Sequence, residues 1–135
     1  MSKHAAISPA IENFYAALNT LFTGDAQPMK DAWSHTEGIS YMGPEGAYLS
    51  GWQQIGPMWD SVGAAKLGGR VTAKEIRTVA EGELALLTCI EAGENVSDGQ
   101  MESVHIRSST VFRLESGHWK VIHHQTDLLS FLNKA

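Results

Sequence analysis

The spacing of apolar residues changes once along the chain, from a helical repeat to a two-residue repeat after Arg70. Near the start, apolar side chains recur at intervals of three and four, which predicts an amphipathic helix of about 14 residues. Ser8 followed by Pro9 is typical of a helix start, with Ser8 as the capping hydroxyl, and Gly24 is typical of a helix end. The apolar stripe consists of Ile11, Phe14, Tyr15, Leu18, Leu21 and Phe22.

The segment between this helix and Arg70 predicts shorter elements. A second helix is expected over residues 28–33 and a strand over residues 35–42, followed by a turn at 43–46 that contains two glycines and a proline. Helical spacing resumes over residues 52–62, but Pro57 lies inside it. Because a proline inside a helix costs about 3 kcal/mol, we expect a helical turn over 52–55 and a helix that restarts at Pro57. Residues 64–69 are expected to form a loop.

After Arg70 the pattern predicts a four-stranded antiparallel meander. The expected strands are 71–79, 84–92, 102–114 and 119–127, with a loop at 93–100 and a short terminal helix at 128–132. The nearly unbroken apolar character of 84–92 suggests burial on both faces, the second of them by another subunit. We therefore predict one α+β domain over residues 1–135, cone-shaped, with N-terminal helices packed on a strongly curved, mainly antiparallel sheet. A homodimer through the sheet is expected.

The last strand carries the main candidate for chemistry. Strict alternation would place Trp119, Val121, His123, Gln125 and Asp127 on one side, as in a pocket wall with an apolar base and a polar rim. With an ordinary pKa near 6.5, His123 is the candidate acid–base residue. The alternatives are a histidine hydrogen-bonded inside the sheet and one that orients a ligand without catalysis.

The neighbouring strand offers two further candidates for the same wall. Arg107 and Ser109 would share its inward face if both lie on the concave side of the sheet. A buried guanidinium needs an anion, which would be a protein carboxylate such as Glu102 or Asp127, or an acidic ligand. The alternative is that Arg107 faces solvent and has no role.

Aromatic residues could line the same pocket. Tyr15 and Tyr41 also offer hydroxyl donors. Each of these rings is equally well explained as part of the hydrophobic core. The candidate lining rings are Tyr15, Trp33, Tyr41 and Trp59, with Trp52 and Trp119 as further members.

Composition and charge narrow the classes of function. The 135 residues are 43% hydrophobic and 19% charged, as in an ordinary soluble protein, and the net charge of −5 without a basic stripe disfavours binding to nucleic acid or anionic membranes. The single cysteine, Cys89, is expected to be a small buried hydrophobe. No signal peptide or membrane span is recognised, so a cytoplasmic location is expected.

Cofactor and metal motifs give no positive signal. The neighbouring residues His123 and His124 would point to opposite faces of a strand, so no metal site is predicted. No phosphate-binding loop or dinucleotide fingerprint is found, and no cofactor is expected.

Two segments resemble the nuclear transport factor 2-like superfamily, within it the SnoaL-like and ketosteroid-isomerase-like branch. The segments are residues 107–113, Arg-Ser-Ser-Thr-Val-Phe-Arg, and residues 117–125, Gly-His-Trp-Lys-Val-Ile-His-His-Gln. The second is similar to the closing strand of that family, which also occurs in the association domains of calcium/calmodulin-dependent kinases. The resemblance implies a cone-shaped pocket and frequent dimers.

The chain departs from the family pattern at positions that matter for chemistry. Gln125 stands where the family has the second histidine of its closing pair, and Gly43 stands where the steroid isomerases have a catalytic aspartate. The hydrogen-bond donors of those isomerases correspond to Ala17 and Thr110. Ordinary steroid-isomerase chemistry is therefore not expected.

Three hypotheses for function follow. The first is an isomerase-, cyclase- or hydrolase-type enzyme that transfers protons on a hydrophobic or acidic small molecule, with His123 as acid or base. The second is a binder without catalysis that fixes the polar end of its ligand with Arg107 and Gln125. The third is an oligomerisation domain. A protein with a pocket for a small-molecule ligand is the preferred prediction, because a single domain has nothing else to oligomerise.

Overall fold

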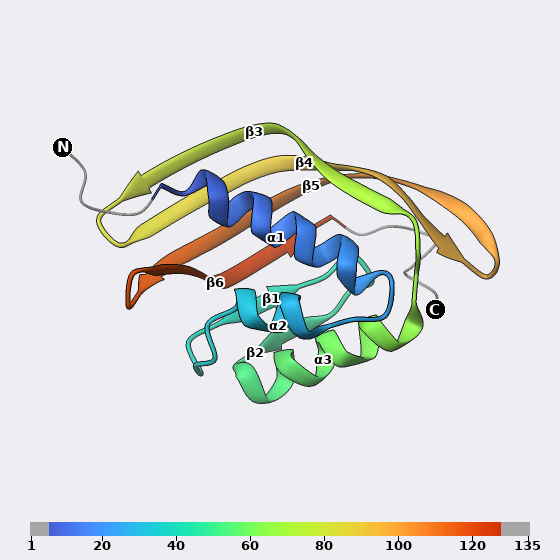
Figure 1. The fold of residues 1–135 in the computed structure, drawn as a ribbon, viewed down its shortest axis with the longest axis horizontal. Helices are drawn as coiled ribbons and strands as arrows, with labels where there is room; N and C mark the ends of the chain where they lie inside the picture. Colours follow the sequence, from blue (N-terminus) through green and yellow to red (C-terminus); the bar gives the residue numbers. More distant parts are fainter. Residues whose placement is uncertain (1–5, 128–135) are drawn as a thin grey trace.

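The computed structural model describes residues 6–127, which form three helices and six strands (Figure 1). The terminal helix expected over residues 128–132 lies outside the described residues. In chain order the elements are α1 (Ser8–Leu21), α2 (Gln27–Ala32), β1 (Ser40–Met42), β2 (Tyr48–Ser50), α3 (Trp52–Ala65), β3 (Arg70–Glu81), β4 (Leu84–Ser97), β5 (Gln100–Glu115) and β6 (His118–Thr126).

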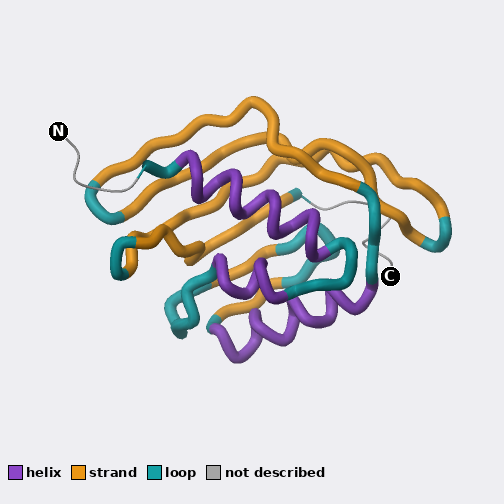
Figure 2. The backbone as a smooth tube through the Cα atoms, in the orientation of Figure 1, coloured by secondary structure: helices purple, strands orange, loops and turns teal. Residues whose placement is uncertain are grey.

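The six strands form one sheet in the order β2-β1-β6-β5-β4-β3. β1 runs parallel to β6, and every other neighbouring pair is antiparallel. The helices lie on one face of this curved sheet, with α1 along the long strands and α3 beside β1 and β2 (Figures 1 and 2). The predicted fold class, helices on a strongly curved and mainly antiparallel sheet, is confirmed.

The predicted four-stranded meander is incomplete, because β1 and β2 extend the sheet beyond β6. The turn at 43–46 connects them as a hairpin, in which the Gly43 amide donates to the Ala47 carbonyl over 3.0 Å. The strand expected over residues 35–42 is confined to Ser40–Met42. Three residues are too few to show a two-residue repeat, so the pattern alone could not reveal β2.

Helix α1 follows its predicted stripe, and its buried residues are Ile11, Phe14, Tyr15, Ala17 and Leu21. The capping role expected for Ser8 is wrong. Ser8 is already the first helical residue, and the preceding Ile7 caps the helix without a side-chain hydrogen bond. Pro9 lies in the first turn and has no backbone N–H. The first turn therefore has one fewer N–H group that lacks a hydrogen-bond acceptor within the helix.

Helix α3 runs through Pro57 without interruption, which corrects the predicted break. Pro57 lies on the exposed side, where water can satisfy the carbonyl that its missing amide leaves free. Ile55 and Trp59, four residues apart, are 0% and 2% exposed. Burial of these two side chains on the same face stabilises the helix on both sides of the proline.

The predicted loop at 93–100 is also wrong, because β4 and β5 continue almost to the end of their hairpin, where Ser97 pairs with Gln100. The polar side chains of this segment do not end the strands, because the backbone pairing between β4 and β5 continues without interruption. Gly93 allows β3 to approach, since a side chain there would overlap the carbonyl of Arg70. The glycine therefore marks a close approach between strands and not a loop.

Strand β4 is buried on one face only in the single chain. Ala85, Leu87 and Cys89 point toward the helices at 6% exposure or less, as predicted for Cys89, whereas Leu84 and Leu86 are 49% and 41% exposed. The expectation of burial on both faces is thus not met within one copy. None of the described helices is long and apolar enough to cross a membrane.

Candidate functional site

A cavity of about 80 Å³ lies between the helices and the inner face of β4, β5 and β6. Most of its wall is apolar, from helices α1 and α3 and from β5. Four side chains in the wall are of titratable types: Tyr41, Glu45, Glu91 and His124. A small apolar cavity with a few converging polar groups is the usual form of a ligand site.

Glu91 and His124 form a buried pair across strand β5. Their side chains are each 6% exposed, and His124 Nε2 lies 3.4 Å from Glu91 Oε2. The Tyr15 hydroxyl donates to the same carboxylate oxygen over 2.8 Å. On its other side, His124 Nδ1 lies 2.8 Å from the Thr110 hydroxyl. Three elements, α1, β5 and β6, therefore hold one carboxylate of β4 in a fixed position.

The surroundings of Glu91 keep it ionised. Burial, the largest single influence, raises the pKa of its carboxyl, but the hydrogen bond and charge of His124 and the hydrogen bond from Tyr15 outweigh it and lower the pKa overall. Burial, followed by the charge of Glu91, raises the pKa of Tyr15 far above its usual range. Tyr15 is thus a permanent donor, and Glu91 is a buried anion that can accept a proton.

Two further residues in the cavity wall have unused hydrogen-bonding atoms. Trp59 and Thr126 are 2% and 8% exposed. Among the described residues, no partner is found for the Trp59 indole N–H or the Thr126 hydroxyl. A buried donor without a partner costs free energy, so such atoms indicate where a bound molecule could hydrogen-bond.

A β-bulge corrects the predicted face of the last strand. Val111 pairs with His123 and Phe112 pairs with Val121, so Ile122 is an extra residue in β6. The alternation changes there. Trp119 and Val121 face inward, as expected, but beyond the bulge His124 and Thr126 face inward instead of His123 and Gln125.

His123 is therefore half-buried on the outer face, away from the cavity. Its Nδ1 lies 2.7 Å from the hydroxyl of Ser40 on β1. Burial, and then the charge of His124, lowers the pKa of His123. Its position matches the alternative of a histidine hydrogen-bonded within the sheet.

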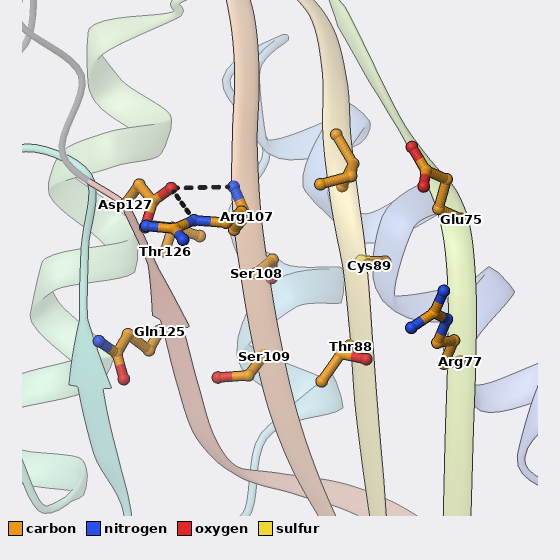
Figure 3. A pocket seen from close by; sticks show the side chains of 11 residues that line it. Glu75, Arg77, Thr88, Cys89, Arg107, Ser108, Ser109, Gln125, Thr126 and Asp127 are labelled. Carbon is orange, nitrogen blue, oxygen red and sulfur yellow. Dashed lines mark hydrogen bonds and ion pairs between the residues drawn. The ribbon is translucent and has the colours of Figure 1, made fainter.

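Arg107, Ser109 and Gln125 also lie on the outer face, around an open groove of about 440 Å³ (Figure 3). The Arg107 side chain is 81% exposed and donates to Asp127 through Nε over 2.7 Å and Nη2 over 3.2 Å. Asp127 was one of the two carboxylates expected to pair with it. In Figure 3 the helices lie behind the strands, so these residues do not reach the inner cavity.

The predicted aromatic residues do lie on the inner side. Tyr41 and Trp59 line the cavity, and their ring centroids are 5.1 Å apart. Trp33 packs on both, at 6.0 Å from Trp59 and 6.4 Å from Tyr41, while Tyr15 reaches the site through Glu91. These rings are core residues and also form or support the cavity wall.

Glu45, Glu91 and His124 are candidate site residues that the sequence pattern did not predict. A signal was present for Glu91, which is the only charged residue within the apolar strand from Leu84 to Ala92. A charge in a strand that buries its neighbours must be paired, which could have singled it out. Within residues 6–127, no group of three histidine, cysteine or acidic side chains is placed to hold a metal ion.

The inner cavity is the better candidate site, although the outer groove is larger. The groove is open and its charged groups are exposed, whereas the cavity contains a buried carboxylate–imidazole pair, and electrostatic interactions are stronger at buried sites. A helix-covered, curved sheet that encloses such a cavity defines the class of nuclear transport factor 2-like proteins.

The chain belongs to the SnoaL-like domain family, whose model matches residues 7–130. This confirms the resemblance to the SnoaL-like and ketosteroid-isomerase-like branch of the superfamily. Among curated protein sequences, none matches the chain.

Solved structures share the fold at low sequence identity. A candidate dehydratase of the nuclear transport factor 2-like family from Streptomyces avermitilis is 20% identical, with a TM-score of 0.78, over 91% of this chain and 93% of that one. A candidate calcium/calmodulin-dependent protein kinase type II association domain from Thiobacillus denitrificans is 19% identical, with a TM-score of 0.77, over 96% and 99%. A candidate ketosteroid isomerase from Shewanella frigidimarina is 18% identical, with a TM-score of 0.73, over 91% and 95%. At these identities the likeness shows the fold alone.

Proposed function

We propose that the chain binds a small uncharged molecule in the inner cavity and transfers a proton with Glu91, which His124 and Tyr15 hold in place. The observation that carries this proposal is the buried pair itself, with each side chain 6% exposed and open to a cavity. Burying two ionisable groups is costly, and buried carboxylates with shifted pKa values cluster at functional sites. The ordering by Tyr15 and Thr110 fits a preorganised base.

The size of the cavity limits the ligand. At about 80 Å³ it is smaller than an engineered cavity of about 150 Å³ that binds benzene, and well below the roughly 300–1,000 Å³ of sites for drug-sized molecules. A ligand of a few non-hydrogen atoms fits without rearrangement. A steroid-sized ligand would require α3 or the β1–β2 hairpin to move.

The charges around the cavity favour an uncharged ligand over an acid. Its wall contains Glu45 and Glu91, and none of the described residues lining it is a lysine or arginine. The residue expected to bind an acid, Arg107, is on the outer face and paired with Asp127. An oxygen acceptor on an uncharged ligand would match the unused indole N–H of Trp59.

In this reaction Glu91 accepts a proton from the ligand. Tyr15 and His124 both contact Oε2 of its carboxylate, and Glu91 itself lines the cavity that would hold the ligand. His124 acts as a positioning residue that stabilises the charge of Glu91 before transfer. Thr110, at His124 Nδ1, fixes the orientation of the imidazole ring.

Hydroxyacetone is a suitable probe because it is small and uncharged and has a carbonyl acceptor and acidic C–H bonds. The measurement is exchange of its carbon-bound hydrogens for deuterium, followed by proton NMR in D₂O. We expect the wild-type protein to accelerate exchange, and Glu91→Gln to lower the rate by about 100-fold or more. Glu12→Gln, which removes an exposed carboxylate on α1, is the matched control and should keep the wild-type rate.

A binding experiment distinguishes the enzyme hypothesis from the hypothesis of a binder without catalysis. Titration with acetamide and with acetate, followed through the indole N–H signal of Trp59, should show tighter binding of acetamide. Binding of acetamide without any exchange of hydroxyacetone would favour the non-catalytic binder. Tighter binding of acetate would contradict the proposed charge preference.

We further infer that two copies pair through the outer face of the sheet. Val79 on β3 lies directly opposite Leu86 on β4, and they are 62% and 41% exposed, beside Leu84 at 49%. The groove next to them has two basic and two acidic side chains, Arg77, Arg107, Glu75 and Asp127. A surface with both signs can match a second copy of itself, as a two-fold interface requires.

Sedimentation velocity tests this pairing. The wild type should sediment as a dimer at micromolar concentration, and Leu86→Glu should sediment as a monomer because it places a charge in the apolar part of the interface. Met101→Glu, at a residue 58% exposed near the β4–β5 turn, is the control and should stay dimeric. A monomeric wild type would rule out the interface.

A further inference from the structure

The space left by Gly43 brings a second carboxyl group, that of the exposed residue Glu45, to the edge of the cavity. Gly43 does not have a positive φ, so its backbone does not require glycine. A β-carbon at this position would instead lie 2.6 Å from Cε2 of Tyr41 and closer still to the Tyr41 hydroxyl and to Oε1 of Glu45. The absent side chain is what allows these two groups to meet.

The β1–β2 hairpin holds Glu45 in that space. The Gly43 amide donates to the Ala47 carbonyl over 3.0 Å, and the Gly46 amide donates to the Gly43 carbonyl over 3.1 Å. This tight turn folds Glu45 back over Gly43. Both Tyr41 and Glu45 then line the cavity that also contains Glu91 and His124.

From this arrangement, the geometry points to Glu45 as a second proton-transfer group, which acts on the same ligand as Glu91 and is admitted to the cavity by Gly43. The inference rests on the proposed function of the cavity. It adds a group from a different element, the β1–β2 turn. It also explains why a glycine precedes Pro44 where the backbone does not need one.

The two carboxyls have opposite tendencies to ionise. Burial, the largest influence, raises the pKa of Glu45, although the amides of Glu45 and Ala47 oppose it, whereas the pKa of Glu91 is lowered. Tyr41 adjoins both, and its pKa is raised by burial, then by Glu45 and Glu91, so it stays a neutral donor. Two carboxyls whose pKa values are pushed apart suit the roles of acid and base.

The proposed step conserves protons. Glu45, in its protonated form, gives its proton to an oxygen of the ligand, while ionised Glu91 takes a proton from a ligand carbon. The ligand gains one proton and loses one, and exchange with water restores the two carboxyls. No oxidant, reductant or metal takes part in this transfer.

The first arm of the test measures the titration of Glu45 by ¹³C NMR of labelled glutamate carboxyls, assigned with Glu45→Gln. Gly43→Ala should displace the Glu45 carboxyl from the edge of the cavity and move its titration down toward that of a fully hydrated glutamate. Gly38→Ala is the matched control, because a β-carbon at Gly38 meets no atom within 4 Å. Equal titration of Glu45 in the wild type and in both variants would overturn the placement.

The second arm measures hydroxyacetone exchange as a function of pH. Glu45→Gln should lower the rate by about 100-fold and remove the decline of the rate as Glu45 loses its proton, while Glu45→Asp should recover part of the rate. A Glu45→Gln variant with the wild-type rate and pH profile would exclude Glu45 as a transfer group. If that variant is active and Glu91→Gln is not, the proposed function stands and only this inference fails. A wild type without exchange contradicts both.

Discussion

Each face of the long strands carries one carboxylate paired with a basic side chain, and the two pairs have opposite surroundings. Glu91 and His124 lie on the inner face, each 6% exposed and 3.4 Å apart. Arg107 and Asp127 lie on the outer face at 81% and 40% exposure and are closer, at 2.7 Å. The shorter distance belongs to the solvated pair, where side-chain entropy and screening offset the attraction. The distance between two charged groups therefore does not show which pair contributes more to stability, whereas their burial does.

The inner pair also differs in what would happen if it lost a partner. An exposed charge whose partner is removed is hydrated by water. A buried charge whose partner is removed keeps its desolvation cost without compensation. The outer pair can thus change freely, whereas the inner pair constrains α1, β4, β5 and β6 together through Tyr15 and Thr110.

The largest expected effect comes from removing one member of the inner pair. Glu91→Leu should reduce the free energy of unfolding by about 3–5 kcal/mol, because His124 and Tyr15 lose their acceptor inside the core. Urea unfolding at neutral pH measures the loss. The double variant Glu91→Leu/His124→Leu should recover part of the stability, since it leaves neither charge behind. A single variant as stable as the wild type would show that the pair is not buried in solution.

The pH dependence of stability gives the next effect in size. The pKa of Glu91 is lowered in the folded protein, so the folded state binds fewer protons than the unfolded state and stability increases with pH. The contribution of Glu91 is complete above its unfolded pKa of about 4.3 and is lost as the pH falls through the lower folded pKa.

Comparison with Glu91→Gln isolates this contribution from that of other carboxyls. Between neutral pH and about pH 3, the wild type should lose more stability to urea than Glu91→Gln does. The control Glu12→Gln should follow the wild type, because Glu12 is exposed on α1. Glu45→Gln should show the opposite trend to Glu91→Gln. Its stability relative to the wild type should increase as the pH rises, because the pKa of Glu45 is raised in the folded protein. Parallel curves for the wild type and Glu91→Gln would contradict the assignment.

The fold was predictable because its elements follow repeats that the chain shows directly. The stripe of α1 and the strand pattern after Arg70 each need only local spacing, and the helix and the strands are found in the structure. Features that depend on a single residue were not predictable in this way. The bulge at Ile122 has no local signature, yet it exchanges His123 for His124 on the inner face of β6.

The site was harder to predict because its residues come from separate elements. Glu91, Glu45 and Tyr15 meet only when β4, the β1–β2 turn and α1 are assembled. The family resemblance implies that Gly43 stands where the steroid isomerases have a catalytic aspartate. It could not show that the carboxyl of Glu45, two residues later, enters the space beside Gly43. The sequence identifies the positions of such groups along the chain, and packing decides which of them face the cavity.

The smallest expected effect belongs to the outer pair and completes the contrast between the faces. Arg107→Ala should leave the urea midpoint unchanged within error, because water replaces the guanidinium at Asp127. The comparison should be made in the Leu86→Glu background, where the protein is expected to be monomeric, because the inferred pairing of two copies covers the groove that contains Arg107. Raised salt should not alter the difference, since screening already weakens an exposed pair. If Arg107→Ala destabilises this monomer as strongly as Glu91→Leu destabilises the wild type, the outer pair is not solvated as described.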